Sequence, residues 1–131
     1  MRRFVLALAA LAGCGNDHHR HDDHEDEPAA SAFTVWTQTH EVFAEYPTFV
    51  VGAESTFAAH LTTRRDHRPV AEGEVTVTLR QADGTTISGK ATGPQSPGLF
   101  RPAVTPTVKG PCTLTLAFGA EDVVTECMVY A

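Results

Sequence analysis

The 131-residue chain has no segment in which apolar residues recur every three or four positions over a dozen residues. That periodicity marks an amphipathic helix, so its absence excludes a helical bundle. Long hydrophobic runs are lacking as well, and the apolar run from Phe4 to Leu11 is too short to cross a bilayer. The chain is therefore expected to fold from strands.

Catalytic motifs and an excess of positive charge are also missing. The sequence has no Gly-x-Ser-x-Gly elbow, no glycine-rich phosphate loop and no His-Glu-x-x-His pair, so no enzymatic activity is expected. Ten lysines and arginines stand against sixteen aspartates and glutamates, which gives a formal net charge of −6. A mildly acidic chain has no electrostatic footprint for nucleic acid, so no nucleic-acid partner is expected.

The N-terminus has the features of an export signal. Arg2 and Arg3 supply the positive start, residues 4–11 the apolar stretch, and Ala12-Gly13 the small residues before a cleavage point. Leu11-Ala12-Gly13-Cys14 resembles the lipobox of bacterial lipoprotein signals, which implies that residues 1–13 are removed and that Cys14 carries a lipid. The protein is then expected in the periplasm, anchored to the inner or the outer membrane. An ordinary signal peptide and a buried N-terminal helix are the alternatives.

Residues 14–32 are expected to form a disordered tether. Within it, residues 17–27, called the histidine tract below, contain four histidines, six acidic residues and one arginine, with no apolar side chain to offset the entropy of ordering. Imidazoles suit Zn²⁺, Co²⁺, Ni²⁺ and Cu²⁺, and carboxylates add oxygen ligands. The predicted ligands of a loosely bound divalent metal are His18, His19, His21, His24, Asp22 and Asp23. The alternative is a solvated acidic spacer whose histidines are incidental.

Residues 33–131 are predicted to form one all-β domain. Apolar and polar residues alternate in "EVTVTLR" (residues 74–80) and "CTLTLAF" (residues 112–118), the period-two pattern of half-buried strands. Turn signals rich in glycine and proline separate such runs. About six to eight short strands of this kind favour a single antiparallel, immunoglobulin-like β-sandwich. Trp36, near its start, is expected to be a packing anchor.

Cys112 and Cys127 flank a predicted hairpin that turns at Gly119-Ala120. A two-residue turn makes the cysteines cross-strand partners, and an exported compartment permits a disulfide between them. A slip by one residue would instead place Met128 opposite Cys112 and leave two buried thiols. Both arrangements stay open at this stage.

Three more histidines lie in the domain. His60 alternates with Ala59 and Leu61 and is expected to point outward from a strand, while His40 and His67 lie in turn-like segments. As a trio they would form a site only if the fold brought them together. Ordinary surface histidines are the simpler expectation.

Three stretches of the domain resemble a known family. They are "YPTFVVGAESTFAAHL" (residues 46–61), "RPVAEGEVTVTL" (residues 68–79) and "SPGLFRPAVTPTVKGPCTLTL" (residues 96–116). Together they resemble the N-terminal domain of heavy-metal efflux adaptors, the periplasmic membrane fusion subunits of resistance-nodulation-division (RND) pumps of the cobalt-zinc-cadmium and copper-silver types. The resemblance implies that the partner is an RND pump or another adaptor subunit.

Two departures from the family shape the expected function. Adaptors continue into further domains where this sequence ends at "MVYA", so a truncated adaptor subunit, a piece of a longer protein or a free-standing relative of the first domain is expected. Copper-silver members bind Cu(I) through clustered methionines, but Met128 is the only methionine besides Met1. The expected function is capture of divalent metal by the tract and its presentation to an efflux system. The alternative is a protein-interaction module without metal.

Overall fold

The computed structural model describes residues 29–131, and every regular element within them is a β-strand. The strands are β1 (Ala30–Trp36), β2 (His40–Pro47), β3 (Phe49–Val50), β4 (Ser55–Thr56), β5 (Ala58–Thr63), β6 (Val75–Arg80), β7 (Thr86–Ala91), β8 (Leu99–Phe100), β9 (Ala103–Val104), β10 (Gly110–Phe118) and β11 (Glu121–Tyr130). This part of the chain contains no helix long and apolar enough to cross a membrane.

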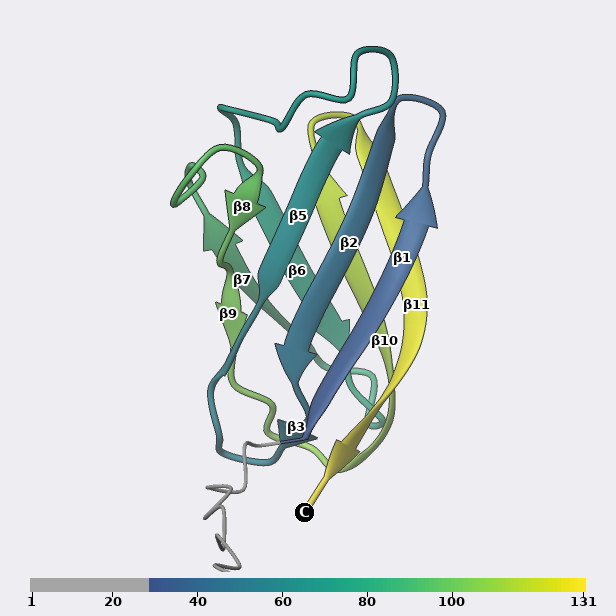
Figure 1. Ribbon diagram of the computed structural model, residues 1–131. Coiled ribbons are helices and arrows are strands. Elements are labelled where there is room, and N and C mark those ends of the chain that lie inside the picture. Colours follow the sequence, from purple (N-terminus) through teal and green to yellow (C-terminus); the bar gives the residue numbers. More distant parts are fainter. Residues whose placement is uncertain (1–28) are drawn as a thin grey trace, which may run out of the picture.

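Two sheets lie face to face and form an immunoglobulin-like β-sandwich (Figure 1). One sheet has the strand order β1-β2-β5-β8 and the other β3-β11-β10-β6-β7, while β4 and β9 form a short separate pair. Every strand pairing among the described residues is antiparallel except that of β3 with β11. The all-β sandwich predicted from the alternating sequence is therefore confirmed.

The start of the domain differs from the expectation. The sequence pattern assigns residues 30–32 to the tether, but β1 begins at Ala30 and these residues pair with residues 45–47 of β2. Their side chains are small, and the more polar Ser31 is the one that faces inward, so the sequence pattern carries no strand signal there. The pairing satisfies backbone N–H and C=O groups, which is reason enough for the strand to extend.

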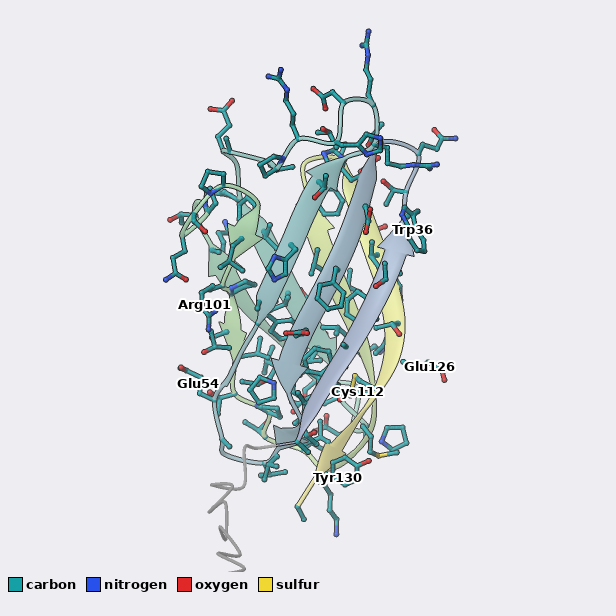
Figure 2. All side chains as sticks on the ribbon, in the orientation of Figure 1. Trp36, Glu54, Arg101, Cys112, Glu126 and Tyr130 are labelled. Carbon is teal, nitrogen blue, oxygen red and sulfur yellow. A yellow bond between two sulfur atoms is a disulfide. The ribbon has the colours of Figure 1, made fainter. Side chains whose placement is uncertain are left out.

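Trp36 is not the packing anchor that was expected. Its side chain is 60% exposed, because the inward positions of β1 are those of Phe33 and Val35. Strict alternation then directs Trp36 to the outer face. Figure 2 shows Trp36 beside the end of β1, at the margin of the sandwich.

The core lies between the two sheets and contains an aromatic stack. The ring centroid of Tyr46 lies 4.7 Å from those of Phe49 and Phe57, which are 6.0 Å from each other, so the three rings form one cluster. Alternate side chains of β6 and β10 complete the core and are fully buried: Val75, Val77, Leu79, Leu114 and Leu116. Each such side chain contributes about 1.5–3 kcal/mol relative to exposure. The alternation predicted for residues 74–80 and 112–118 is thus confirmed.

The β10–β11 hairpin turns where the sequence predicts. Phe118 pairs with Glu121, which leaves Gly119 and Ala120 as a two-residue turn. Gly119 has a positive φ of 57° and Ala120 does not, which is the pattern of a type II′ turn. This turn sets the register of the whole hairpin.

Candidate functional site

The predicted lipidation site and metal tract lie outside the described residues. They are Cys14, His18, His19, His21, His24, Asp22 and Asp23. The structure does show where this segment joins the domain, since the Ala29 carbonyl accepts a 2.8 Å hydrogen bond from the Thr48 N–H just before β1. The start of β1 and the C-terminal end of β11 lie at the same end of the sandwich, called the tract end below (Figure 1).

Apolar side chains are exposed at the tract end. Val50 pairs with Tyr130, and the Val51 N–H donates to the Tyr130 carbonyl, so these residues are neighbours. The exposed fractions are 38% for Val50, 40% for Val51, 42% for Met128 and 55% for Tyr130. Gathered apolar side chains of this kind are typical of a surface that contacts another molecule.

A hydrogen-bonded cluster lies at the opposite, distal end. Nδ1 of His40 lies 3.0 Å from Oε2 of Glu121, and the hydroxyl groups of Thr39 and Thr37 donate to the same carboxylate. These bonds, with that from Thr39 the strongest influence, hold the pKa of Glu121 below its usual value. The His40 ring also packs edge-on against Phe118, with ring centroids 5.1 Å apart. The cluster therefore links the β1–β2 connection to the β10–β11 turn, and so one sheet to the other.

A cavity of about 350 Å³ opens beside this cluster. Its lining includes His40, Glu121, Glu72 and Glu74, which are side chains of metal-ligand type. Within residues 29–131, however, no three histidine, cysteine or acidic side chains lie close enough together to hold a metal ion. The arrangement is that of a structural contact between sheets.

A basic loop lies next to the cluster. Residues 64–68, called the arginine loop below, contain three arginines and one aspartate, a net charge of +2 with His67 neutral. The Arg64 guanidinium donates a 2.7 Å hydrogen bond to the carbonyl of Thr37, the residue that follows β1. Arg65 and Arg68 are exposed. The Arg64 side chain therefore reaches the distal end of β1 from the end of β5, two strands away in the sheet.

The three histidines of the domain do not come together in one site. His40 lies in the distal cluster, and His67 lies in the arginine loop with a positive φ of 54°. His60 lies on the outer face of β5 against Phe43, with ring centroids 5.7 Å apart. The prediction that His60 points outward is confirmed.

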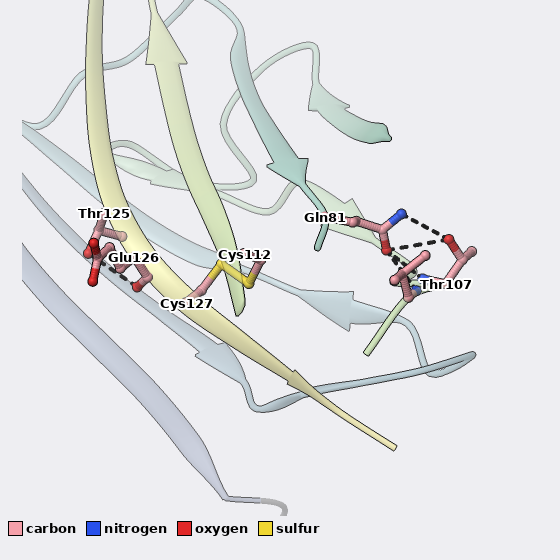
Figure 3. Close-up of a disulfide and its surroundings, with 7 residues drawn as sticks. Gln81, Thr107, Cys112, Thr125, Glu126 and Cys127 are labelled. Carbon is pink, nitrogen blue, oxygen red and sulfur yellow. Dashed lines mark hydrogen bonds between the residues drawn. A yellow bond between two sulfur atoms is a disulfide. The ribbon is translucent and has the colours of Figure 1, made fainter. Parts of the chain in front are cut away.

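A disulfide joins Cys112 and Cys127 (Figure 3). The hairpin register places these residues directly opposite one another, with Cα atoms 4.9 Å apart, while Met128 pairs with Pro111. Cys112 is buried and Cys127 packs partly against the core. The bond ties β10 to β11, and neither sulfur is available as a thiolate ligand.

Gln81 is a buried polar residue that the sequence pattern does not single out. Its side-chain oxygen accepts hydrogen bonds of 2.8 and 3.0 Å from the N–H groups of Thr107 and Val108, and its amide donates to the hydroxyl of Thr107 (Figure 3). The amide also donates to the hydroxyl of Thr85. These bonds hold the segment before β10 against the end of β6. The partners are up to 27 positions apart, so only the fold reveals the role of Gln81.

Comparison with known proteins finds no matching protein family, no matching curated protein and no matching solved structure.

Proposed function

We propose that the protein is a periplasmic lipoprotein of the heavy-metal efflux adaptor type, which binds divalent transition metal ions and presents them to an RND efflux system. The observation that carries the proposal is the histidine tract. It holds four histidines among six acidic residues and Arg20, a net charge of −5 that accounts for most of the −6 of the chain. The tract ends at residue 27, and only two residues separate it from the start of β1 at Ala30.

The chemistry of the tract suits exchangeable binding. Neutral imidazoles ligate the metal and carboxylates attract it, but the same carboxylates favour the protonated imidazole. Metal affinity therefore decreases as the pH is lowered. Ordering the chain around an ion costs about 1–2 kcal/mol for each residue fixed. Weak, rapidly exchanging binding favours capture and hand-off over storage.

The tract end has exposed apolar side chains near the point where the tract joins the domain. Val50, Val51, Met128 and Tyr130 are exposed there, close to the point where the tract joins β1. An efflux subunit bound at this end would lie within reach of metal held by the tract. The same exposed side chains favour the second candidate function, an interaction module in which the tract serves only as a spacer.

Calorimetric titration with Zn²⁺ separates the two candidates. Residues 29–131 form a sandwich around their own core, so a soluble protein beginning at Gly15 retains both the domain and the tract. Replacing His18, His19, His21 and His24 by alanine should weaken Zn²⁺ binding at least about tenfold. The matched control is His60→Ala with His67→Ala, which removes surface histidines of the domain and should leave the isotherm unchanged. An unaltered isotherm in the fourfold variant would reject metal capture in favour of the interaction module.

A further inference from the structure

Strand β1 leaves one edge unpaired along its length. Among residues 29–131 it pairs only with β2. The hydrogen bonds at its two ends show which groups face β2: Ala29 accepts from Thr48, and the Thr37 N–H donates to His40. Odd-numbered residues therefore bond to β2, since alternate residues of an antiparallel strand bond to opposite sides. The N–H and C=O groups that point to the open edge are those of Ala30, Ala32, Thr34 and Trp36.

This edge lacks the protection that natural sheets give their edges. Edge strands are normally very short, charged, interrupted by proline or a bulge, or covered by another segment. β1 has seven residues with no charge and no proline, and its register with β2 is unbroken. In the five-stranded sheet, the open edge along β11 carries Glu121, Asp122 and Glu126. The edge strand β7 at its other side carries Lys90, and β9 packs closely against it at Gly89. Of these three edges, only β1 is both uncovered and free of charge.

We propose that β1 pairs antiparallel with β1 of a second copy of this chain, about a two-fold axis at Phe33. In this register Ala30 lies opposite Trp36 of the second copy, and Ala32 lies opposite Thr34 of the second copy. All four outward-facing residues then enter hydrogen-bonded pairs. The two four-stranded sheets join into one continuous sheet, and the interface is self-complementary as two-fold symmetry requires.

The side chains fit this arrangement. Trp36 is 60% exposed in the single chain. In the dimer its indole lies over Ala30 and, diagonally, Ala32 of the second copy, whose small side chains leave room for it. No two charged side chains oppose one another, whereas pairing of two β11 strands would bring acidic residues together.

Charge complementarity identifies the second copy as the occupant of the edge. Antiparallel pairing brings Ala30 of one copy to the distal end of the other, where Arg64 is bonded to Thr37. The tract of one copy, with a net charge of −5, then joins β1 at the same end of the sheet as the arginine loop of the other copy, which has a net charge of +2 and follows β5, two strands from β1. Glu27 is three residues from Ala30, a span of at most about 11 Å. Within a single chain the arginine loop is at the far end of β1 from the tract.

Sedimentation velocity of the soluble protein beginning at Gly15 tests this dimer. A chelator is present throughout, so the outcome does not depend on the metal binding proposed above. At low salt the sedimentation coefficient should rise with protein concentration from that of a monomer to that of a dimer. About 0.5 M salt should weaken the association, because it screens the attraction between tract and loop. Wild-type protein that sediments as a monomer at every concentration in low salt would overturn the proposal. The open edge of β1 would then be a binding site for a different protein and not for a second copy of this chain.

Two sets of variants locate the interface. Thr34→Pro removes an N–H that points to the open edge and leaves the bonds to β2 in place, so dimerisation should weaken at least about tenfold. Thr34→Val is its matched control, since it keeps the N–H and should dimerise like the wild type. Arg65→Glu with Arg68→Glu should weaken the dimer at low salt and have little effect at high salt.

Folding of each variant is checked by circular dichroism. If Thr34→Pro does not fold, Ala32→Lys provides the same test, because a lysine on the outer face of an edge strand opposes pairing. A folded Thr34→Pro or Ala32→Lys protein that dimerises as strongly as the wild type would show that β1 is not the interface.

Discussion

His40 and Glu121 are 81 positions apart in the sequence, yet Nδ1 of His40 lies 3.0 Å from Oε2 of Glu121. The contact joins the two sheets at the distal end, and the hydroxyls of Thr37 and Thr39 complete it. Because these groups stabilise the charged carboxylate, the contact makes the stability of the sandwich depend on pH.

Replacing Glu121 by glutamine should destabilise the protein at neutral pH by about 0.2–1 kcal/mol, the range for an ion pair in contact with solvent. The pKa of Glu121 is lower in the folded chain than its usual 4.5, so its contribution is present above that value and is lost as the pH falls through the folded pKa. Urea denaturation should therefore show a smaller difference from wild type at about pH 3 than at neutral pH. Glu126→Gln, on the exposed face of the same strand, is the control. A difference that stayed constant in acid would contradict this account.

Loss of the Cys112–Cys127 disulfide should lower the free energy of unfolding by about 3 kcal/mol, because the bond closes a loop with a sequence separation of 15. Thermal unfolding with and without a reductant measures the effect. The double variant Cys112→Ala with Cys127→Ala should unfold at the lower temperature and show no response to the reductant. If the oxidised and the reduced wild type unfolded at the same temperature, the disulfide would not stabilise the fold.

Gly89→Ala should destabilise the sandwich by at least about 1–3 kcal/mol. A Cβ at position 89 would lie 1.7 Å from the carbonyl oxygen and 2.7 Å from the carbonyl carbon of Ala103, so β7 and β9 would have to separate. Gly93→Ala is the matched control, since a Cβ there has no atom within 4 Å. Chemical denaturation of both variants tests the close approach of the two strands. Equal stability of Gly89→Ala and Gly93→Ala would argue against it.

Tyr46 should ionise at a higher pH in the folded chain than in the unfolded chain. Burial raises its pKa above 10.0, against a smaller opposing effect of its hydrogen bond with Ser31. The stability that accompanies the raised pKa is present below 10.0 and is lost as the pH rises through the folded pKa. In Tyr130→Phe protein, Tyr46 is the only tyrosine, so tyrosinate absorbance reports it alone. Coinciding titrations of native and urea-unfolded protein would contradict the burial effect.

Local patterns predicted much of the fold because they are dictated by backbone geometry. Alternation placed Val75, Val77 and Leu79 on the core face and His60 on the outer face, and both placements are confirmed. The glycine at position 119 allowed the tight hairpin turn to be predicted for the same kind of reason. The expectation that Trp36 is a packing anchor is wrong, because the alternation of β1 directs Phe33 and Val35 inward and Trp36 outward.

Contacts between distant segments had no comparable signal. No spacing in the chain predicts the hydrogen bond between Thr37 and Glu121. The same holds for the hydrogen bonds between Gln81 and Thr107. The start of β1 at Ala30 has no signal in the sequence, because alanine and serine are small and Ser31 faces inward while the alanines are exposed; only the pairing with β2 shows that they are in a strand.

The amino-acid order alone determines the strand-forming pattern of residues 33–131 and the concentration of histidines and acidic residues in the tract, since hydrophobic period and side-chain type are properties of the residues themselves. The partner of Cys112, the neighbours of Glu121, the open edge of β1 and the hydrogen bond of Arg64 to its distal end depend on which strands lie next to one another. Those neighbours are set by the packing of two sheets around one core. They bring together residues that the chain keeps many positions apart.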